Sequence, residues 1–113
     1  MRDARQVYDD HWASIRAGDM DRILADYADA AVFIRPNTVA RGRTEIRGVF
    51  DELGDLLAGF DLTQESVTVD GPLVLFEWSG RNPDGRTARG ADTFYITDDR
   101  IRLQTLSYSI SDS

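Results

Sequence analysis

The amino-acid sequence predicts an α+β fold in which three N-terminal helices pack on one face of an antiparallel sheet. Two observations lead to this class. Apolar residues recur every three or four positions through most of the first 60 residues, and this spacing gives way to alternation from residue 61 onward. Turn signals rich in Asp, Gly and Pro then divide the second half into four segments of strand length. Helices gathered against consecutive antiparallel strands define the α+β class.

Three helices and one short strand are expected in the first 60 residues. The first helix ends at Gly18, a residue type that favours the position after a helix, and Asp19 can cap a second, shorter helix. A short strand over 31–34 and a turn at 35–37 precede a third helix from about Thr44. The apolar stripes of the three helices are Val7, Tyr8, His11, Trp12 and Ile15, then Met20, Ile23, Leu24 and Tyr27, then Ile46, Val49, Phe50, Leu53, Leu57 and Phe60.

The second half of the chain predicts four consecutive strands, over 62–69, 73–78, 86–97 and 100–110. Asp70, Gly71 and Pro72 form the first turn, 82–85 the second and 98–99 the third. The strand over 73–78 is almost continuously apolar, which indicates that both of its faces are covered.

The register of the last two hairpins decides which side chains face the helices, because a slip of one residue exchanges the two faces. A five-residue loop over 81–85 pairs Phe76 with Gly90 and Val74 with Asp92. A two-residue turn at 98–99 pairs Asp92 with Thr105. The predicted inner face consists of Val74, Phe76, Trp78, Asp92, Phe94, Ile96, Ile101, Leu103, Thr105 and Ser107.

Asp92 and His11 are the two chemically notable residues on the predicted inner surfaces. Burial among apolar side chains raises the pKa of a carboxyl, so Asp92 is a candidate general acid or hydrogen-bond donor. The alternatives are a structural role satisfied by Thr105 or a backbone amide, or exposure through another register. His11 lies on the apolar stripe of the first helix and is either a satisfied core residue or a catalytic one.

The opposite face of the predicted sheet is also apolar, with Leu73, Leu75, Tyr95, Leu106, Tyr108 and Ile110. Three helices can cover only one face, so the second needs another partner. A symmetric homodimer is the common solution and is expected here. The alternative is a solvent-facing surface with scattered apolar residues.

Composition excludes several kinds of chemistry and of partner. All 13 basic residues are arginine, cysteine is absent and there is one histidine. Schiff bases, thiol nucleophiles and multi-histidine zinc sites therefore cannot form on this chain. A net charge of −7 disfavours nucleic acid and anionic membranes as partners. No leader or spanning segment is recognised, so we expect a cytoplasmic location. The length predicts one domain over 1–113. We expect neither a metal nor a cofactor.

Six short segments, in this order and spacing, resemble the NTF2-like (cystatin-like) superfamily, and in particular its SnoaL-like and ketosteroid-isomerase-like branch. They are Gly18-Asp19-Met20-Asp21, Tyr27-Ala28-Asp29-Ala30-Ala31-Val32, Gly42-Arg43-Thr44-Glu45-Ile46-Arg47, Phe76-Glu77-Trp78, Asp92-Thr93-Phe94 and Asp99-Arg100-Ile101. The resemblance covers essentially the whole chain. It implies a cone in which three N-terminal helices pack on a curved antiparallel sheet and enclose an apolar pocket, with homodimers formed through the outer sheet face.

The catalytic residues of ketosteroid isomerases carry over only in part. Asp92, in the motif Asp-x-Phe, matches the protonated aspartate of their oxyanion hole. His11 occupies the position of the tyrosine in that oxyanion hole. Their aspartate base is missing, because Ile34 and Arg35 stand before Pro36 where the base would lie. Proton transfer along a steroid enone therefore has no obvious base.

Two other enzyme types of the superfamily are considered. Limonene-type epoxide hydrolases need an Asp-Arg-Asp group, which Asp92 with Arg89 or Arg35 matches only in part, since the last strand offers no carboxylate over 103–108. SnoaL-type cyclases use one aspartate acid/base in the pocket, and Asp92 with His11 fits that plan best.

The sequence thus predicts a homodimeric SnoaL-like protein whose pocket takes a small, neutral, cyclic or polycyclic molecule. Asp92 and His11 would contact a carbonyl oxygen of the ligand. A cofactor-independent isomerase, cyclase or hydrolase using general acid/base chemistry is one interpretation. A non-catalytic module for ligand binding or dimerisation is the other. The expected ligand-contacting residues are Trp12, Tyr27, Trp78, Phe94, Thr105 and Ser107.

Overall fold

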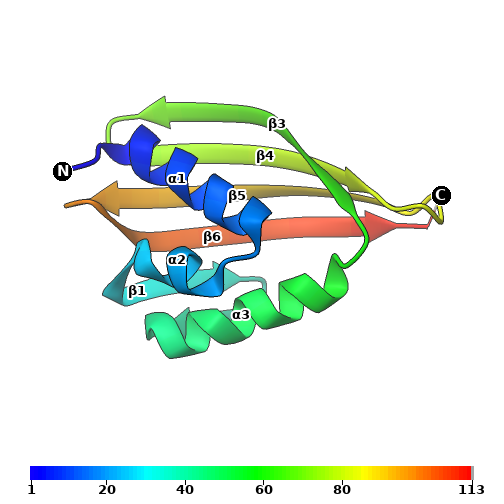
Figure 1. The fold of residues 1–113 in the computed structure, drawn as a ribbon, viewed down its shortest axis with the longest axis horizontal. Helices are drawn as coiled ribbons and strands as arrows, with labels where there is room; N and C mark the ends of the chain where they lie inside the picture. The colour runs from blue at the N-terminus through cyan, green and yellow to red at the C-terminus, as the bar shows by residue number, and fades with distance from the viewer. Residues whose placement is uncertain (113) are drawn as a thin grey trace.

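A curved six-stranded sheet forms one layer of the fold, and three helices lie against one of its faces (Figure 1). The computed structural model describes residues 1–112. Along the chain the elements are α1 (Ala4–Ala17), α2 (Met20–Ala25), β1 (Tyr27–Arg35), β2 (Thr38–Arg41), α3 (Gly42–Leu56), β3 (Asp61–Asp70), β4 (Leu73–Arg81), β5 (Thr87–Thr97) and β6 (Arg100–Ser111). The strand order is β2-β1-β6-β5-β4-β3, and the sheet does not close. The predicted α+β class is confirmed.

The first two helices lie where the sequence predicts them, and capping residues define their ends. Asp3 caps α1 by accepting a hydrogen bond from the backbone N–H of Gln6, whose side chain in turn accepts from the N–H of Asp3. Gly18 ends α1 in the left-handed conformation at φ 67°. Asp19 caps α2. The second helix is shorter than its apolar stripe suggests, because Tyr27 already belongs to β1.

The sheet contains more of the N-terminal half than predicted. The expected strand over 31–34 is the end of the nine-residue β1, which forms a hairpin with β2 through a turn at Pro36 and Asn37. Asn37 adopts a positive φ of 63°, which asparagine tolerates in turns. β1 also pairs in parallel with β6, so the sheet is mixed rather than purely antiparallel. The partner strand lies about 70 residues away, and no local pattern reports such a pairing.

The β4–β5 hairpin is shifted by two residues from the predicted register. Phe76 pairs with Asp92 and Trp78 pairs with Gly90. A shift by an even number leaves every side chain on its predicted face. Asp92, Phe94 and Ile96 therefore still point toward the helices.

The predicted register of β6 is wrong beyond its first residues. Ile96 pairs with Ile101 as expected, but Tyr95 pairs with Leu103, so Arg102 is an extra residue. This bulge reverses the faces of the rest of the strand. Leu103, Thr105 and Ser107 lie on the outer face, and Gln104, Leu106, Tyr108 and Ile110 take the inner one.

The outer sheet face keeps a smaller apolar patch than expected. Leu73, Leu75 and Tyr95 are about 40% exposed there, as predicted. Leu106 is buried, and Tyr108 and Ile110 pack against the core, which corrects their assignment to this face. The register adds exposed Ile34 and Val39 from the β1–β2 hairpin. The outer patch consists of Ile34, Val39, Leu73, Leu75 and Tyr95.

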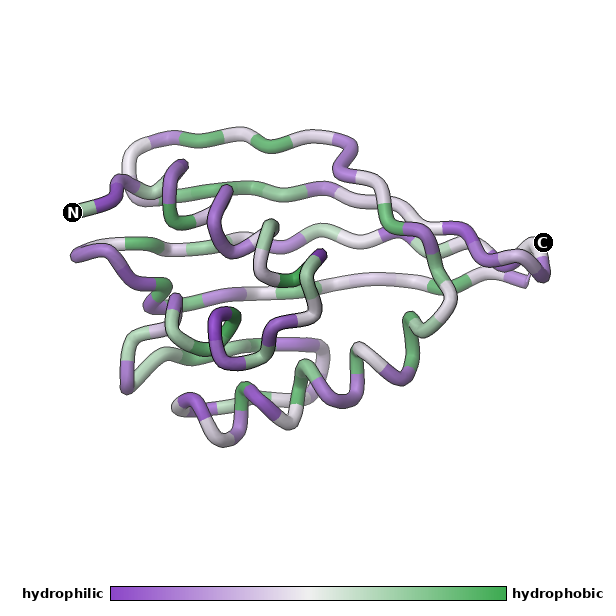
Figure 2. The backbone as a smooth tube through the Cα atoms, viewed as in Figure 1, coloured by the Kyte–Doolittle hydropathy of each residue, from purple (hydrophilic) through white to green (hydrophobic). Residues whose placement is uncertain are grey.

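The main core lies between the sheet and the helices. Hydrophobic and hydrophilic segments alternate along α3 in Figure 2, as expected of a helix with one face against the sheet. Ile46 and Val49 are its buried residues, and Tyr8 and Val7 of α1 are almost wholly buried. Among residues 1–112, no helix is long and apolar enough to cross a membrane.

Candidate functional site

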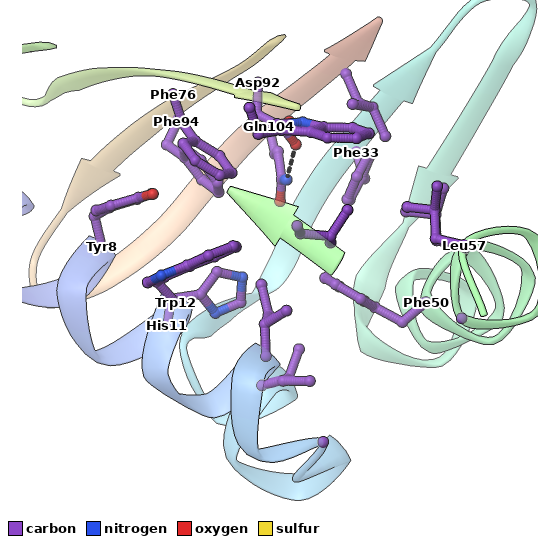
Figure 3. Close-up of a pocket in the computed structure, with 18 of the residues that line it drawn as sticks. Tyr8, His11, Trp12, Phe33, Phe50, Leu57, Phe76, Asp92, Phe94 and Gln104 are labelled. Atoms are coloured by element: carbon purple, nitrogen blue, oxygen red, sulfur yellow. Dashed lines mark hydrogen bonds between the residues drawn. The ribbon is translucent and has the colours of Figure 1, made fainter. Parts of the chain in front are cut away.

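A cavity of about 340 Å³ lies between the helices and the inner face of the sheet (Figure 3). Its volume falls at the lower end of the range, roughly 300 to 1,000 Å³, that is typical of small-molecule sites. Most of its lining is aromatic or aliphatic. The lining residues are Tyr8, His11, Trp12, Ile15, Gly18, Met20, Ile23, Phe33, Phe50, Leu53, Gly54, Leu57, Leu62, Phe76, Trp78, Asp92, Phe94, Gln104 and Leu106.

Asp92 provides the one carboxylate of this lining and is 6% exposed. Its Oδ1 accepts a 2.9 Å hydrogen bond from Trp78 Nε1, and its Oδ2 accepts a 2.8 Å hydrogen bond from Gln104 Nε2. Burial raises the pKa of Asp92 from 3.8 to about 6, although these two donors oppose the rise by stabilising the anion. The carboxyl can therefore change its protonation state near neutral pH.

Gly90 allows Trp78 to reach Asp92. A Cβ atom at Gly90 would lie 2.3 Å from two carbons of the indole and 2.7 Å from its nitrogen. The indole therefore passes directly over the bare backbone of β5. A glycine in a strand interior often marks such a close approach, and here it positions the donor of the carboxylate.

A chain of buried polar groups continues from Asp92 away from the cavity. The amide oxygen of Gln104 accepts a short hydrogen bond from the Tyr27 hydroxyl. The Tyr27 oxygen lies 3.2 Å from His11 Nε2, and His11 Nδ1 lies 3.0 Å from Asp26 Oδ2. Burial, followed by the charges of Asp92 and Asp26, raises the pKa of Tyr27 well above its ordinary value.

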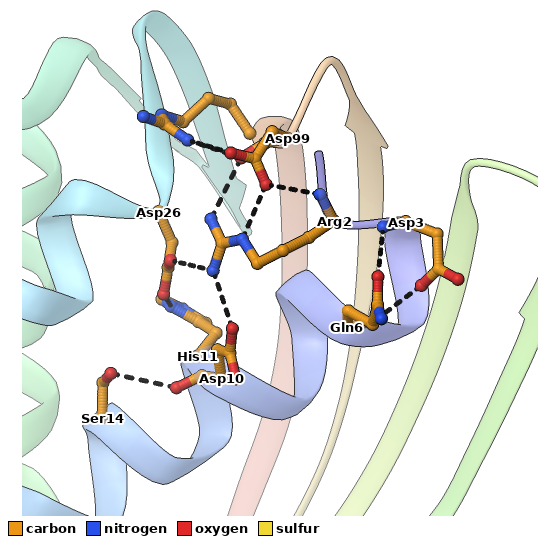
Figure 4. A network of polar contacts seen from close by, with 9 residues as sticks. Arg2, Asp3, Gln6, Asp10, His11, Ser14, Asp26 and Asp99 are labelled. Atoms are coloured by element: carbon orange, nitrogen blue, oxygen red, sulfur yellow. Dashed lines mark hydrogen bonds and ion pairs between the residues drawn. The ribbon is translucent and has the colours of Figure 1, made fainter.

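An arginine anchors the far end of this chain, at the surface. Arg2 Nη1 lies 3.1 Å from Asp26 Oδ1 and also contacts Asp10, and Arg2 Nε lies 2.6 Å from Asp99 Oδ1 (Figure 4). This pairing lowers the pKa of Asp99. The N-terminal segment is thereby tied to the β5–β6 turn, and the second oxygen of Asp26 is held toward His11.

The structure brings most of the predicted site residues together. Asp92, His11, Trp12, Trp78 and Phe94 all line the cavity. Both ring nitrogens of His11 face protein partners, so its ring borders the cavity through carbon atoms.

Three of the expected ligand-contacting residues lie elsewhere. Tyr27 has no exposed surface and is behind His11, outside the cavity lining. Thr105 and Ser107 lie on the outer face of the sheet because of the β6 bulge. The two arginines considered for an Asp-Arg-Asp group with Asp92 are also absent from the lining: Arg35 pairs with Glu52, and Arg89 borders an open groove on the outer face.

Gln104 is the site residue that the sequence interpretation missed. The apolar residues of the last strand fall at odd positions up to Leu103 and at even positions from Leu106. This change of parity is a signal for a bulge, and a bulge near 102 places Gln104 beside Asp92.

A family model described as a SnoaL-like domain matches residues 4–104, and the chain belongs to this family. The match confirms the resemblance to the SnoaL-like and ketosteroid-isomerase-like branch of NTF2-like proteins. Among curated proteins, no significant sequence match was found.

Solved structures of similar fold come from several bacteria. An NTF2-like protein of unknown function from Burkholderia xenovorans has a TM-score of 0.76 at 23% identity, covering 94% of this chain and 82% of its own. A putative polyketide cyclase from Sinorhizobium meliloti has a TM-score of 0.75 at 21% identity, covering 89% and 93%. A putative ketosteroid isomerase from Kribbella flavida has a TM-score of 0.77 at 15% identity, covering 94% and 77%. At these identities the likeness concerns the fold.

Proposed function

We propose that this protein binds a small, neutral, cyclic molecule in its apolar cavity and exchanges a proton or hydrogen bond with it at Asp92. The observation that carries the proposal is a buried carboxyl with a raised pKa, about 6, in a lining that is mostly aromatic and aliphatic. A carboxyl of this pKa can act as base or acid near neutral pH. Isomerisation, cyclisation and hydrolysis by general acid/base chemistry are the reaction types that it suits, with no cofactor.

The cavity lining supports a ligand that is mostly apolar and cyclic. Tyr8 and Trp12 hold their rings 5.4 and 5.2 Å from that of Phe76. Phe33 and Phe50 pack against each other on the opposite side, with 6.1 Å between their rings. Flat aromatic walls of this kind match flat or cyclic ligands, and the single carboxyl would fix the position of one oxygen.

A second candidate function is ligand binding without catalysis. Both oxygens of Asp92 already accept a hydrogen bond from a protein donor, which is the arrangement of a satisfied structural carboxylate. In that case the ligand would be held by the apolar walls alone.

Ligand binding can be tested by thermal shift with steroids, polyketide-like ketones and terpene epoxides, since a ligand that binds the folded state raises its melting temperature. Gly54 and Gly48 provide a matched pair on α3: both have open space around an added Cβ, but only Gly54 lines the cavity. We expect Gly54→Leu to abolish the shift and Gly48→Leu to keep it. A shift that both variants keep would place the ligand outside the cavity.

The role of Asp92 is tested on a ligand that passes this screen. Asp92→Asn keeps the shape of the side chain and removes its titration. Turnover that disappears in Asp92→Asn while binding persists supports acid/base chemistry. Binding without turnover in the wild-type protein, unchanged in Asp92→Asn, supports the second candidate.

We also propose that two copies associate through the outer patch of Ile34, Val39, Leu73, Leu75 and Tyr95. Five exposed apolar side chains lie on the outer sheet face, two on the β1–β2 hairpin and three on β4 and β5, with β6 between the two groups. Exposed apolar side chains gathered on one face are typical of interfaces. Sedimentation at micromolar concentration is expected to show a dimer that Leu75→Glu converts to monomer. A wild-type monomer at that concentration would contradict the proposal.

A further inference from the structure

One set of proton positions satisfies every contact of the buried chain when the amide of Gln104 is oriented as in the structure. The amide nitrogen of Gln104 donates to Asp92, so the amide oxygen faces Tyr27 and accepts its one hydroxyl proton. The Tyr27 oxygen can then only accept from His11, which requires a proton on Nε2. His11 Nδ1 faces the carboxylate of Asp26, which is held by Arg2, and so carries a proton as well.

In this first state, therefore, Asp92 is a carboxylate and His11 is an imidazolium. The pair carries one negative and one positive charge, linked through two neutral side chains.

A second state satisfies the same contacts between side chains once the nitrogen and oxygen of the Gln104 amide exchange places. When Asp92 is protonated on Oδ2, it donates to the amide oxygen of Gln104, and the amide is turned end for end. The Gln104 nitrogen then donates to the Tyr27 oxygen, and the Tyr27 hydroxyl donates to His11 Nε2, which now carries no proton. Nδ1 still donates to Asp26. One proton has left His11 Nε2 and one has been added to Asp92 Oδ2, so the total number of protons and the net charge are unchanged.

We propose that Asp92 and His11 share one proton, and that Gln104 and Tyr27 are positioning residues that hold the site in one of these two hydrogen-bonded states. The Asp92 side chain then faces the cavity either as a carboxylate or as a carboxylic acid, and the net charge of the protein is the same in both states. This inference rests on the proposed function in one respect only, namely that Asp92 is the group that contacts the ligand. The hydrogen bonds themselves exist in the ligand-free protein.

Asp92 and His11, the two ends of the buried chain, are connected by hydrogen bonds through Gln104 and Tyr27. Asp92 is faced by Trp78 from β4 and Gln104 from β6. The Tyr8 phenol of α1 is also near, and its pKa is raised by burial and, to a smaller extent, by the charge of Asp92. His11 is faced by Asp26 after α2, Tyr27 of β1, and the uncharged rings of Phe50 on α3 and Phe94 on β5. Trp78 is only a donor and cannot take part in the reversal.

The chain offers clean spectroscopic probes of both ends. His11 is the only histidine of the sequence, so its ring ¹⁵N signals belong to one residue, and only Nδ1 and Nε2 have to be distinguished. Trp78 is one of two tryptophans, and its indole N–H donates directly to Asp92. The measurement is the fraction of His11 with a proton on Nε2 at pH 7 in ligand-free protein.

Asp92→Asn imitates the second state, because an amide nitrogen at that position must donate to the Gln104 oxygen. We expect the ratio of protonated to unprotonated Nε2 to fall at least about tenfold, the coupling of roughly one pH unit that marks interacting sites. Nδ1 is expected to keep its proton. An unchanged ratio overturns the proposal.

Loss of the negative charge at Asp92 also acts on His11 directly through space. A second substitution, which interrupts the hydrogen-bonded chain, separates this direct electrostatic effect from the effect that passes along the chain. Tyr27→Phe interrupts the chain and keeps the charge, so in this background Asp92→Asn is expected to change the ratio less than about twofold, the scatter expected of independent sites. Gln104→Met is a second interruption in case Tyr27→Phe does not fold. Tyr8→Phe, which removes a hydroxyl outside the chain, is the control that keeps the full effect. An equally large effect in the interrupted backgrounds overturns the proposal.

Discussion

The indole nitrogen of Trp78 lies 2.9 Å from Asp92 Oδ1 and donates a hydrogen bond to it. Trp78 on β4 pairs with Gly90 on β5, and Asp92 lies two residues further along β5 on the same face. A bond from a neutral donor to a buried anion stabilises the charged form. Trp78 therefore keeps the pKa of Asp92 lower than burial alone would set it.

Trp78→Phe is expected to raise the pKa of Asp92 above its present value of about 6. The ring remains but the donor is lost, and a hydrogen bond to a charged group contributes roughly 1.5 to 3 kcal/mol, or about one to two pH units. The ¹³C signal of the Asp92 carboxyl in an NMR titration measures this shift. Trp12→Phe changes another tryptophan of the cavity lining and is the control that should leave the midpoint in place. Equal shifts in both variants would contradict the direct role of the Trp78 donor.

Gly90→Ala is expected to displace the indole from Asp92. The added Cβ would meet Trp78 at 2.3 Å, so the ring must move and the hydrogen bond breaks. Overpacking of this kind costs about 1 to 3 kcal/mol. Gly80→Ala on the neighbouring strand meets the mobile end of Leu62 at 2.8 Å and should cost less. Urea unfolding compares the two, and a cost for Gly80→Ala as large as that for Gly90→Ala would argue against the close approach as the cause.

Leu106→Ala and Leu103→Ala test the bulge in β6. Leu106 is 5% exposed and lines the cavity, whereas Leu103 faces outward beside Tyr95. Truncation of a buried leucine costs about 2 to 5 kcal/mol, and we expect Leu106→Ala to fall in this range and Leu103→Ala well below it. Free energies of unfolding from denaturant titration decide the point. The opposite order of costs is what the regular register without a bulge would give.

The sequence predicts the fold well wherever its signals are local. Gly18 and Asp19 act through neighbouring backbone groups, so their patterns locate the end of α1 and the start of α2. The parallel pairing of β1 with β6 depends on residues such as Phe33 and Gln104, which are 71 positions apart and carry no shared pattern. It was therefore missed, together with β2.

The candidate site follows the same division. Asp92 is recognisable as a carboxyl in an apolar alternation, and its raised pKa agrees in direction with that expectation. Its neighbours depend on a single extra residue in β6, which exchanges Thr105 for Gln104. Tyr27 could not be placed behind His11 without the course of β1 across the sheet.

The contribution of Asp92 to the stability of the protein should fall as pH rises from about 4 to about 6. The pKa of Asp92 is 3.8 when exposed and about 6 in the folded protein, so over this interval the folded state binds more protons than the unfolded state. A group of this kind favours folding most when it is protonated, and its contribution is lost on ionisation. The difference in pKa corresponds to roughly 3 kcal/mol between the two ends of the interval, at the usual 1.4 kcal/mol per unit.

Paired carboxyls such as Asp99, whose pKa is lowered by Arg2, act in the opposite direction at lower pH. Comparison with Asp92→Asn removes the Asp92 titration, because the amide does not titrate, and the difference also includes any change that the substitution causes at His11 through the buried chain. Denaturant unfolding at pH 4, 5, 6 and 7 should show the difference in stability between wild type and Asp92→Asn changing steadily in favour of the variant up to about pH 6 and then levelling off. A constant difference across the series would mean that Asp92 has an ordinary pKa in the folded state, and the acid/base role of the cavity would lose its main support.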